Sequence, residues 1–212
     1  MEKIQEEQKM KLYLIRHGET DWNKTKRLQG VTDIPLNACG IELAEKTAEG
    51  LKDVPFDRIY TSPLIRAKKT AEIIRGDRPV ELVVTDGLKE ISFGEYEGLC
   101  HEPEHYTIPK PGFRKFFEDP EHFETPPGGE SLAHLIKRTS SFVKSVINDP
   151  ENDGKTFLMA SHGAAIRGIM SGLLNLPIAQ FWSGTVHKNC GVTCLHVENG
   201  QVTITFENRI YY

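Results

Sequence analysis

The sequence of 212 residues lacks several features that would place it in particular classes of protein. No apolar run approaches the roughly 20 residues that a membrane-spanning helix needs, so a membrane protein is not expected. The four cysteines are too few for a disulfide-stapled scaffold, and such sparse cysteine favours a reducing, cytoplasmic compartment. The formal net charge of −4 shows no basic excess, which argues against a nucleic-acid partner.

The first ten residues, MEKIQEEQKM, also lack the apolar segment of a signal peptide. We therefore expect residues 1–10 to form an N-terminal extension. The remaining composition is ordinary for a globular protein, with 38% hydrophobic and 26% charged residues. A chain of this length buries a sizeable core, and a single domain over residues 1–212 is expected.

Apolar segments of strand type alternate with amphipathic segments of helix type, which predicts strand-helix-strand units. The expected strands cover residues 11–15, 57–62, 80–85 and 155–160, followed by a hairpin of 190–197 and 201–207 closed by Asn199 and Gly200. The expected helices cover residues 35–54, 62–76, 131–147 and 162–174. Ser62 is expected as the N-cap of the second helix, with Pro63 at its first position. This pattern predicts a three-layer α/β/α fold with a mostly parallel mixed sheet.

Residues 99–130 interrupt the alternation with prolines and glycines placed among aromatic residues. The aromatic side chains give this segment apolar surface with which to dock on the domain, so a free linker is not expected. A substrate-covering insertion is the natural interpretation of such a long excursion.

A histidine-glycine pair follows an apolar strand twice, in LYLIRHGET and in TFLMASHGAA. The carboxyl ends of parallel strands share one edge of a sheet, where ligands bind. His17 and His162 are therefore expected to face each other across that edge. The helix after His162 is expected to direct free N–H groups and its positive dipole end at a bound anion.

Two arginines add to this interpretation. Arg66 lies in the first turns of its helix, where a cation opposes the helix dipole unless an anion binds nearby. Arg16 directly precedes His17, and arginine binds phosphate oxygens through two parallel hydrogen bonds. Each feature alone is weak, because a lone His-Gly pair is more often a turn and a lone Arg66 a solvated charge. Together they predict an oxyanion pocket for a phosphoryl group.

A series of sequence motifs is similar to the motifs of a known family. They are LIRHGETDWN, RLQG, DIPLNACG, TSPLIRAKKTA, LKEISFGEYEG, GGES and ASHG, in this order. In this respect the chain resembles the histidine phosphatase superfamily, also called the phosphoglycerate mutase-like family, over about Lys11 to Gly172. The resemblance implies a phosphoglycerate mutase-like fold.

The resemblance also implies roles for individual residues. His17 would be the nucleophile that forms a phosphohistidine, with His162 and the two arginines in the same catalytic set. The implied phosphate-binding set is Arg16, Asn23, Arg66, His162 and Gly163. The implied proton donor is Glu90, which could also serve as the base; the residues alone leave Glu90, Glu95 and Glu97 open.

The departures from the family pattern are mild at two positions, with Tyr96 where tryptophan is common and Lys89 where arginine is common. The segment ISFGEYEGL does not resemble the His- and Tyr-rich segment of the true mutases, which favours the phosphatase branch. The resemblance thus implies a metal-independent phosphomonoesterase of the histidine acid type, acting on a small phosphorylated metabolite. A phosphoglycerate mutase, an alpha-ribazole phosphatase and an inactive phosphate-binding module are the alternatives.

Two further patterns suggest metal sites but are better explained otherwise. HEPEH, residues 101–105, matches the zinc-hydrolase pattern, yet Pro103 would disrupt the helix that this pattern needs. Cys190 and Cys194 on an extended strand would lie about 13 Å apart, too far to share one ion. No metal and no cofactor are therefore expected, and the sequence leaves a homodimer open.

Overall fold

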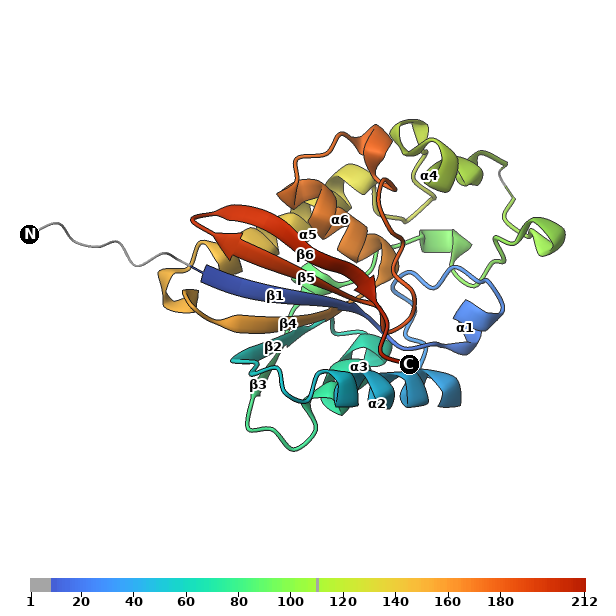
Figure 1. Cartoon of the computed structure of the whole chain (residues 1–212). Coiled ribbons are helices and arrows are strands. Elements are labelled where there is room, and N and C mark those ends of the chain that lie inside the picture. Colours follow the sequence, from blue (N-terminus) through green and yellow to red (C-terminus); the bar gives the residue numbers. More distant parts are fainter. Residues whose placement is uncertain (1–8, 110) are drawn as a thin grey trace, which may run out of the picture.

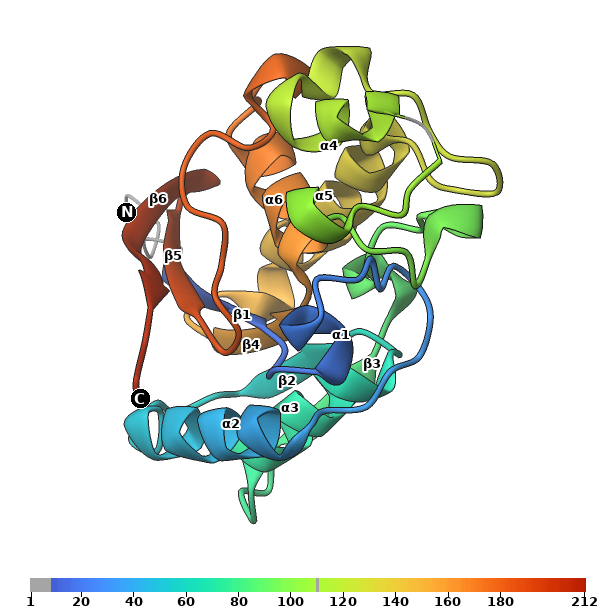
Figure 2. The same ribbon diagram turned by 90° about the vertical axis from the view of Figure 1, so that its right-hand side faces the viewer.

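The computed structural model describes residues 9–109 and 111–212, and these form three layers (Figure 1). The described residues contain a six-stranded sheet of order β3-β2-β4-β1-β5-β6. The strands are β1 (Lys9–Arg16), β2 (Arg58–Thr61), β3 (Glu81–Val84), β4 (Thr156–Ser161), β5 (Val192–Glu198) and β6 (Gln201–Arg209). The α-helices are α1 (Asp21–Lys24), α2 (Ala38–Gly50), α3 (Ile65–Arg75), α4 (Lys115–Glu118), α5 (Leu132–Ile147) and α6 (Gly163–Leu173). Helices α2 and α3 cover one face and α5 and α6 the other (Figure 2), as the three-layer prediction requires.

The sheet is mixed: β1, β2, β3 and β4 run parallel to one another, β5 pairs antiparallel with β1, and β6 pairs antiparallel with β5. Strand β1 pairs with β4 in a register that sets Arg16 opposite Ser161. The next residues, His17 and His162, therefore leave neighbouring strands at the same carboxyl edge. The alternation of segments thus predicted both the fold class and the edge at which the two histidines meet.

Strand β1 is buried on both faces because it lies in the middle of the sheet. Leu12 and Leu14 pack in a core with Ile166 of α6. Ile15 points the other way, into a second core with Ala44 of α2. Alternate side chains of a strand point to opposite faces, so an apolar run such as LYLI serves both layers and fixes the position of Arg16 and His17.

The ends of several predicted elements need correction, and the helix expected over residues 35–54 spans only Ala38–Gly50. Lys9 and Met10 belong to β1, so the extension expected over residues 1–10 is too long, and residues 1–8 lie outside the described part. Helix α3 begins at Ile65 with Leu64 as N-cap, which makes the prediction of Ser62 and Pro63 as its start wrong. The hydroxyl of Ser62 instead forms a hydrogen bond with His162, the residue directly after β4.

Among the described residues of the 99–130 segment, irregular backbone joins several short turns of helix. They are η3 (Pro103–His105), η4 (Pro111–Arg114), α4 and η5 (Pro120–His122); the other 3₁₀ turns are η1 (Asp86–Leu88), η2 (Gly94–Tyr96), η6 (Pro150–Asn152) and η7 (Ile178–Gln180). Phe113 and Phe116 are buried and pack edge-to-face against Phe93, with ring centroids 5.6 and 5.2 Å away. Burial of these rings, each worth about 2–3 kcal/mol, docks the segment on the domain.

Among the described residues, no helix has the length and apolar character needed to cross a membrane.

The first turn of α2 packs directly on the backbone that follows His17. A Cβ atom on Gly40 would lie 2.1 Å from the carbonyl oxygen of Glu19, which the backbone cannot easily avoid. We expect Gly40→Ala to destabilise the protein by about 1–3 kcal/mol, although alanine normally favours a helix. Urea unfolding measures this, with Gly112→Ala as control because nothing lies within 4 Å of a Cβ there. An unchanged unfolding midpoint for Gly40→Ala would contradict the close packing.

Candidate active site

A cavity of about 530 Å³ opens at the carboxyl edge of the parallel strands, beside α1. Six residues of the implied site line it: Arg16, His17, Asn23, Arg66, Glu90 and Gly163. His162 is fully buried directly behind them, with its ring centroid 5.1 Å from that of His17. The structure therefore brings the whole implied set together from five separate segments of the chain.

His17 is held with one ring nitrogen committed and the other free. Its Nδ1 lies 2.7 Å from the carbonyl oxygen of Gly18, and a carbonyl only accepts, so Nδ1 carries the hydrogen. The lone pair is then on Nε2. Burial, with the positive charges of Arg66 and Arg16, holds the pKa of His17 well below its ordinary value. The ring is thus neutral near pH 7 and its Nε2 is a competent nucleophile.

His162 is oriented by Ser62, whose hydroxyl lies 2.7 Å from Nε2. Its Nδ1 is buried and has no hydrogen-bond partner among the described residues. Burial and the charge of Arg66 also hold the pKa of His162 well below its ordinary value. A buried polar atom without a partner costs about 1–3 kcal/mol, so Nδ1 is a position at which a ligand would be favoured.

Arg16 and Arg66 are gripped through their terminal nitrogens. Arg16 Nη1 donates to the carbonyl of His187 at 2.7 Å, and Arg66 donates to the carbonyls of Gly30 and Thr32 at 2.6 and 2.8 Å. The Nε–H of each arginine is buried without a partner in the described part of the chain. Burial lowers the pKa of Arg66 to about 10, which leaves it charged at neutral pH. Two fixed guanidinium groups with unused donors favour a bound anion.

Asn23 faces the same cavity from the turn after His17. Its Oδ1 accepts hydrogen bonds from the Thr20 backbone N–H at 3.1 Å and from Asn189 Nδ2 at 3.2 Å. Because the amide oxygen is occupied, the amide NH₂ of Asn23 is the group left to donate. Asn189 also donates to the carbonyl of His17 at 3.1 Å, so one side chain holds both residues.

Glu90 occupies the amino end of α6. Its carboxylate accepts from the backbone N–H groups of Ala164 and Ala165 at 3.2 and 2.8 Å. The expectation that these N–H groups are free for a bound anion is therefore wrong, because Glu90 takes them. Burial raises the pKa of Glu90, against hydrogen bonds and the charge of Arg66 that lower it. A raised pKa is what a carboxylic acid needs to donate a proton near neutrality.

The other two candidate carboxylates lie elsewhere. Glu95 is exposed to solvent. Glu97 accepts from the backbone N–H groups of Val31 and Thr32 at 3.0 and 2.8 Å. It thereby fixes the loop whose carbonyls hold Arg66, and it does not line the cavity. Of the three acids, Glu90 is therefore the one beside the two histidines.

The cavity is positively charged although the chain as a whole is negative. Five cations line it, Arg16, Lys24, Lys26, Arg27 and Arg66, against the two carboxylates Glu19 and Glu90. The lining also includes the aromatic residues Phe93, Phe116, Phe117 and Trp182, and the 99–130 segment supplies two of these together with His101. Such a field attracts anions into the cavity and strengthens their binding in its depth.

The HEPEH segment ends in the turn η3, and His101 lines the cavity through its side chain. No group of three or more potential metal-ligating side chains comes together anywhere in residues 9–109 and 111–212. Cys190 and Cys194 are buried free thiols of β5 and the residues before it.

Three residues that support the site were not predicted from the sequence: Ser62, Thr70 and Asn189. Thr70 Oγ1 accepts from the Gly18 N–H at 3.0 Å and donates to the carbonyl of Arg66 at 2.8 Å, so it ties the two halves together. Local sequence carries no signal for the bonds from Gly18 to Thr70, from Ser62 to His162 and from Asn189 to His17, since each joins residues far apart in the chain.

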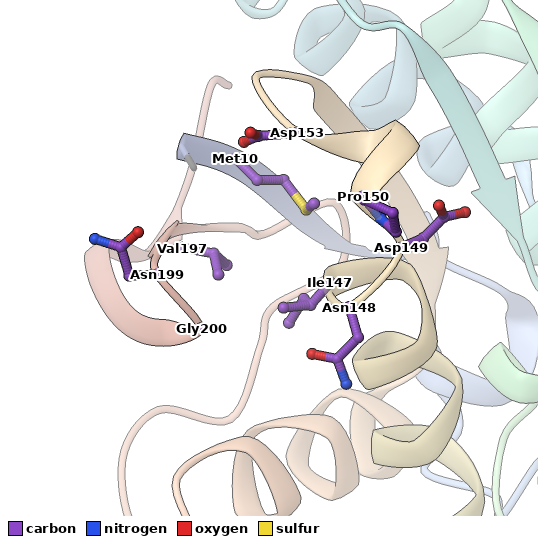
Figure 3. Close-up of a pocket in the computed structure, with 9 residues that line it drawn as sticks. All are labelled: Met10, Ile147, Asn148, Asp149, Pro150, Asp153, Val197, Asn199 and Gly200. Carbon is purple, nitrogen blue, oxygen red and sulfur yellow. The ribbon is translucent and has the colours of Figure 1, made fainter. Parts of the chain in front are cut away.

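A second hollow at the opposite end of the sheet is a poor alternative (Figure 3). It measures about 30 Å³ and lies between the end of α5 and the β5–β6 turn. Its polar side chains include Asp149 and Asp153 and no basic residue. A negatively charged hollow of this size does not accept a phosphoryl group.

The chain is similar to a known protein family and to several characterised or solved proteins. The model of the histidine phosphatase superfamily (branch 1) matches residues 12–209. The Uncharacterized phosphatase PhoE of Bacillus subtilis is 39% identical over 158 residues, 74% of each chain. Phosphoserine phosphatase 1 of Hydrogenobacter thermophilus is 33% identical over 89% of this chain and 87% of that protein. The structure of Bacillus stearothermophilus YhfR superposes with a TM-score of 0.86 at 32% identity, covering 95% of this chain and 98% of that one.

Proposed function

Because the chain belongs to the histidine phosphatase superfamily, we propose that it is a metal-independent phosphomonoester hydrolase that acts through a phosphohistidine on His17. One observation carries the proposal. The neutral His17 ring lies in a cationic cavity between two arginines whose buried Nε–H groups have no partner among the described residues. A phosphoryl group is the anion whose oxygens such donors fit and whose phosphorus a neutral imidazole attacks.

In the first step, a phosphomonoester binds with its oxygens at Arg16, Arg66 and His162. The lone pair of His17 Nε2 attacks phosphorus, and the bond from phosphorus to the ester oxygen breaks. Glu90, in its protonated form, gives its proton to that oxygen, so the product leaves as a neutral alcohol. The arginines counter the charge that spreads over the phosphoryl oxygens, which is the role that a metal ion plays in other phosphatases.

In the second step, water attacks the phosphohistidine. Glu90, now ionised, accepts a proton from this water, and the bond from phosphorus to Nε2 breaks. Asn23 and the Gly163 backbone complete the set of phosphate contacts. Gly163 leaves room here, since a Cβ would lie 3.7 Å from Arg16 Nε and 4.0 Å from Glu90 Oε2. Inorganic phosphate then departs, and His17 and Glu90 return to their starting states.

The pKa shifts support an acid-type phosphatase. His17 must be neutral to attack, and its lowered pKa keeps it so at mildly acidic pH. Glu90 must be protonated to donate, and its raised pKa extends the protonated form toward neutrality. The two conditions overlap at mildly acidic to neutral pH, which is where we expect the highest rate.

We expect the purified protein to hydrolyse 4-nitrophenyl phosphate with the same kcat/KM in the presence and absence of EDTA. The reason is that Arg16 and Arg66 supply the positive charge at the phosphoryl oxygens, while the neutral His162 ring offers a hydrogen bond. Release of 4-nitrophenol, followed at mildly acidic pH, measures this. Strict dependence on added zinc would contradict the proposed chemistry.

A mutase on the same site is the second candidate, since phosphohistidine chemistry serves transfer to a second hydroxyl as well as to water. Incubation with 2-phosphoglycerate separates the two: we expect free phosphate, whereas predominant 3-phosphoglycerate would overturn the assignment. The physiological substrate is then sought with a panel of phosphorylated metabolites. Phosphoserine belongs in it because one relative is a phosphoserine phosphatase, and alpha-ribazole phosphate because the resemblance leaves it open.

A further inference from the structure

We infer that Arg138 of α5, held in place by Glu130, is a positioning residue for the proton donor Glu90. The inference rests on the proposed function, in which Glu90 is the general acid and base. Neither Arg138 nor Glu130 lines the cavity around His17. Their effect on the reaction is therefore exerted through the segment that carries Glu90.

The backbone that carries Glu90 belongs to no helix or strand. It follows the turn η1, and Glu90 stands two residues after that turn ends. A segment of this kind has carbonyl groups that no regular hydrogen-bond pattern satisfies, so its position depends on other partners. Arg138 supplies them: its guanidinium donates to the carbonyls of Asp86, Lys89 and Glu90 at 2.8, 3.0 and 3.4 Å.

Glu130 aligns that guanidinium. Arg138 Nε and Nη2 donate to the two carboxylate oxygens of Glu130 at 3.0 and 2.8 Å, the paired geometry that fixes the plane of an arginine. The backbone N–H of Glu130 also donates to the carbonyl of Ser92 at 2.8 Å, beyond Glu90 on the same segment. Glu130 therefore links α5 to both sides of the proton donor.

This pair differs from an ordinary surface ion pair. The side chains of Arg138 and Glu130 are 21% and 11% exposed, against 39% and 62% for Arg58 and Glu81 in β2 and β3. Burial alone would raise the pKa of Glu130, but the hydrogen bonds from Arg138 and His134 bring it below its ordinary value. The lowered pKa favours the ionised form of Glu130, which is the form that accepts both hydrogen bonds from Arg138.

Glu90 is consequently held from two directions. The N–H groups of α6 hold its carboxylate, and Arg138 holds its backbone. Proton transfer in the transition state depends on distances that change little, and a misplacement of about 1 Å costs up to about 100-fold. A loosened Glu90 segment would weaken proton donation while leaving His17, Arg16 and Arg66 in place.

The test is the dependence of kcat/KM on the leaving group in Arg138→Lys. Lysine keeps the charge opposite Glu130 but has no planar fork to span the carbonyls. We expect about a 10- to 100-fold loss with glycerol 2-phosphate, whose alkoxide needs a proton to leave. With 4-nitrophenyl phosphate, whose phenolate leaves without one, we expect less than about a 3-fold loss. The parameter kcat/KM is chosen because it excludes the later hydrolysis of the phosphohistidine.

Three controls make the result decisive. Arg58→Lys alters an Arg-Glu pair at the amino end of β2 and is expected to change neither substrate's kcat/KM. Adding Arg138→Lys to Glu90→Gln is expected to cost nothing further, because a positioning residue acts only through the residue it positions. Inhibition by inorganic phosphate is expected to be unchanged, because the phosphate contacts are intact.

Where Arg138→Lys folds poorly, Glu130→Gln gives the same test, with an expected loss of about 3- to 10-fold for the alkyl ester alone. Equal losses for both esters, or no loss for either, would overturn the role of Arg138. An additive loss in the double variant would overturn it too. Failure of the wild-type protein to form a phosphohistidine would instead contradict the proposed function, so the two failures are distinguishable.

Discussion

A His17→Ala variant is expected to lose phosphatase turnover by about 10³-fold or more and to form no phosphoenzyme. The loss is this large because the variant removes the atom that forms the bond to phosphorus. Removing one member of a set of catalytic residues that act together costs about as much as removing the whole set. Binding of inorganic phosphate should persist, since Arg16 and Arg66 remain. Rapid alkaline quenching followed by intact mass measurement detects the phosphoryl group in the wild-type protein, with stability in alkali and loss in acid as the mark of phosphohistidine.

The matched control is His122→Ala, which removes a histidine whose side chain is 66% exposed and bound only to Asp119 among the described residues. It should leave turnover and phosphoenzyme formation unchanged. Retention of substantial turnover by His17→Ala would reject His17 as the nucleophile. A phosphoryl group found on His162 in that variant would transfer the role to the second histidine.

The juxtaposition of His17 and His162 could be predicted because two local patterns met a general rule of sheet topology. Each histidine follows an apolar strand, and parallel pairing of β1 with β4 brings the ends together. Arg66 was predicted for a similar reason, since its place in the first turn of α3 is a local conflict that a bound anion relieves. Features of this kind can be predicted because they depend on short, local stretches of the sequence.

The supports of those side chains could not be predicted, because they depend on contacts between distant segments. Asn189 reaches the carbonyl of His17 across 172 positions of the chain. Serine is a common N-cap residue, yet the hydroxyl of Ser62 forms a hydrogen bond with His162, 100 positions away. Helix α3 begins later than expected. Local propensity yields wherever a buried polar group such as the His162 ring needs a partner.

The partner of the N–H groups at the amino end of α6 could not be predicted from the sequence either, and it matters for the mechanism. Sequence pattern correctly places the helix directly after His162, but it cannot tell which anion its N–H groups bind. In the structure they bind Glu90. In the proposed mechanism, the phosphoryl group therefore relies mainly on the side chains of Arg16, Arg66 and His162. Glu90 in turn has a fixed position at the same cavity, which is why we propose it as the proton donor.

A Glu90→Gln variant is expected to lose about 10²- to 10⁴-fold in kcat/KM for glycerol 2-phosphate and far less for 4-nitrophenyl phosphate. Glutamine keeps the size and an oxygen acceptor for the α6 N–H groups but has no proton of suitable acidity to give. The wild-type rate for the alkyl ester should also fall as pH rises through the raised pKa of Glu90, where the acid form disappears. That alkaline limb should be missing in the variant.

Two neighbouring carboxylates separate this prediction from a general effect of lost charge. Glu95→Gln should change nothing, because Glu95 is exposed and outside the cavity. Glu97→Gln should lower kcat/KM equally for both esters, because Glu97 holds the loop whose carbonyls bind Arg66 and takes no part in proton transfer. The acid limb, set by protonation of His17 below its ordinary pKa, should survive in Glu90→Gln. A variant that keeps the alkaline limb, or that loses equally with both esters, would show that another group donates the proton.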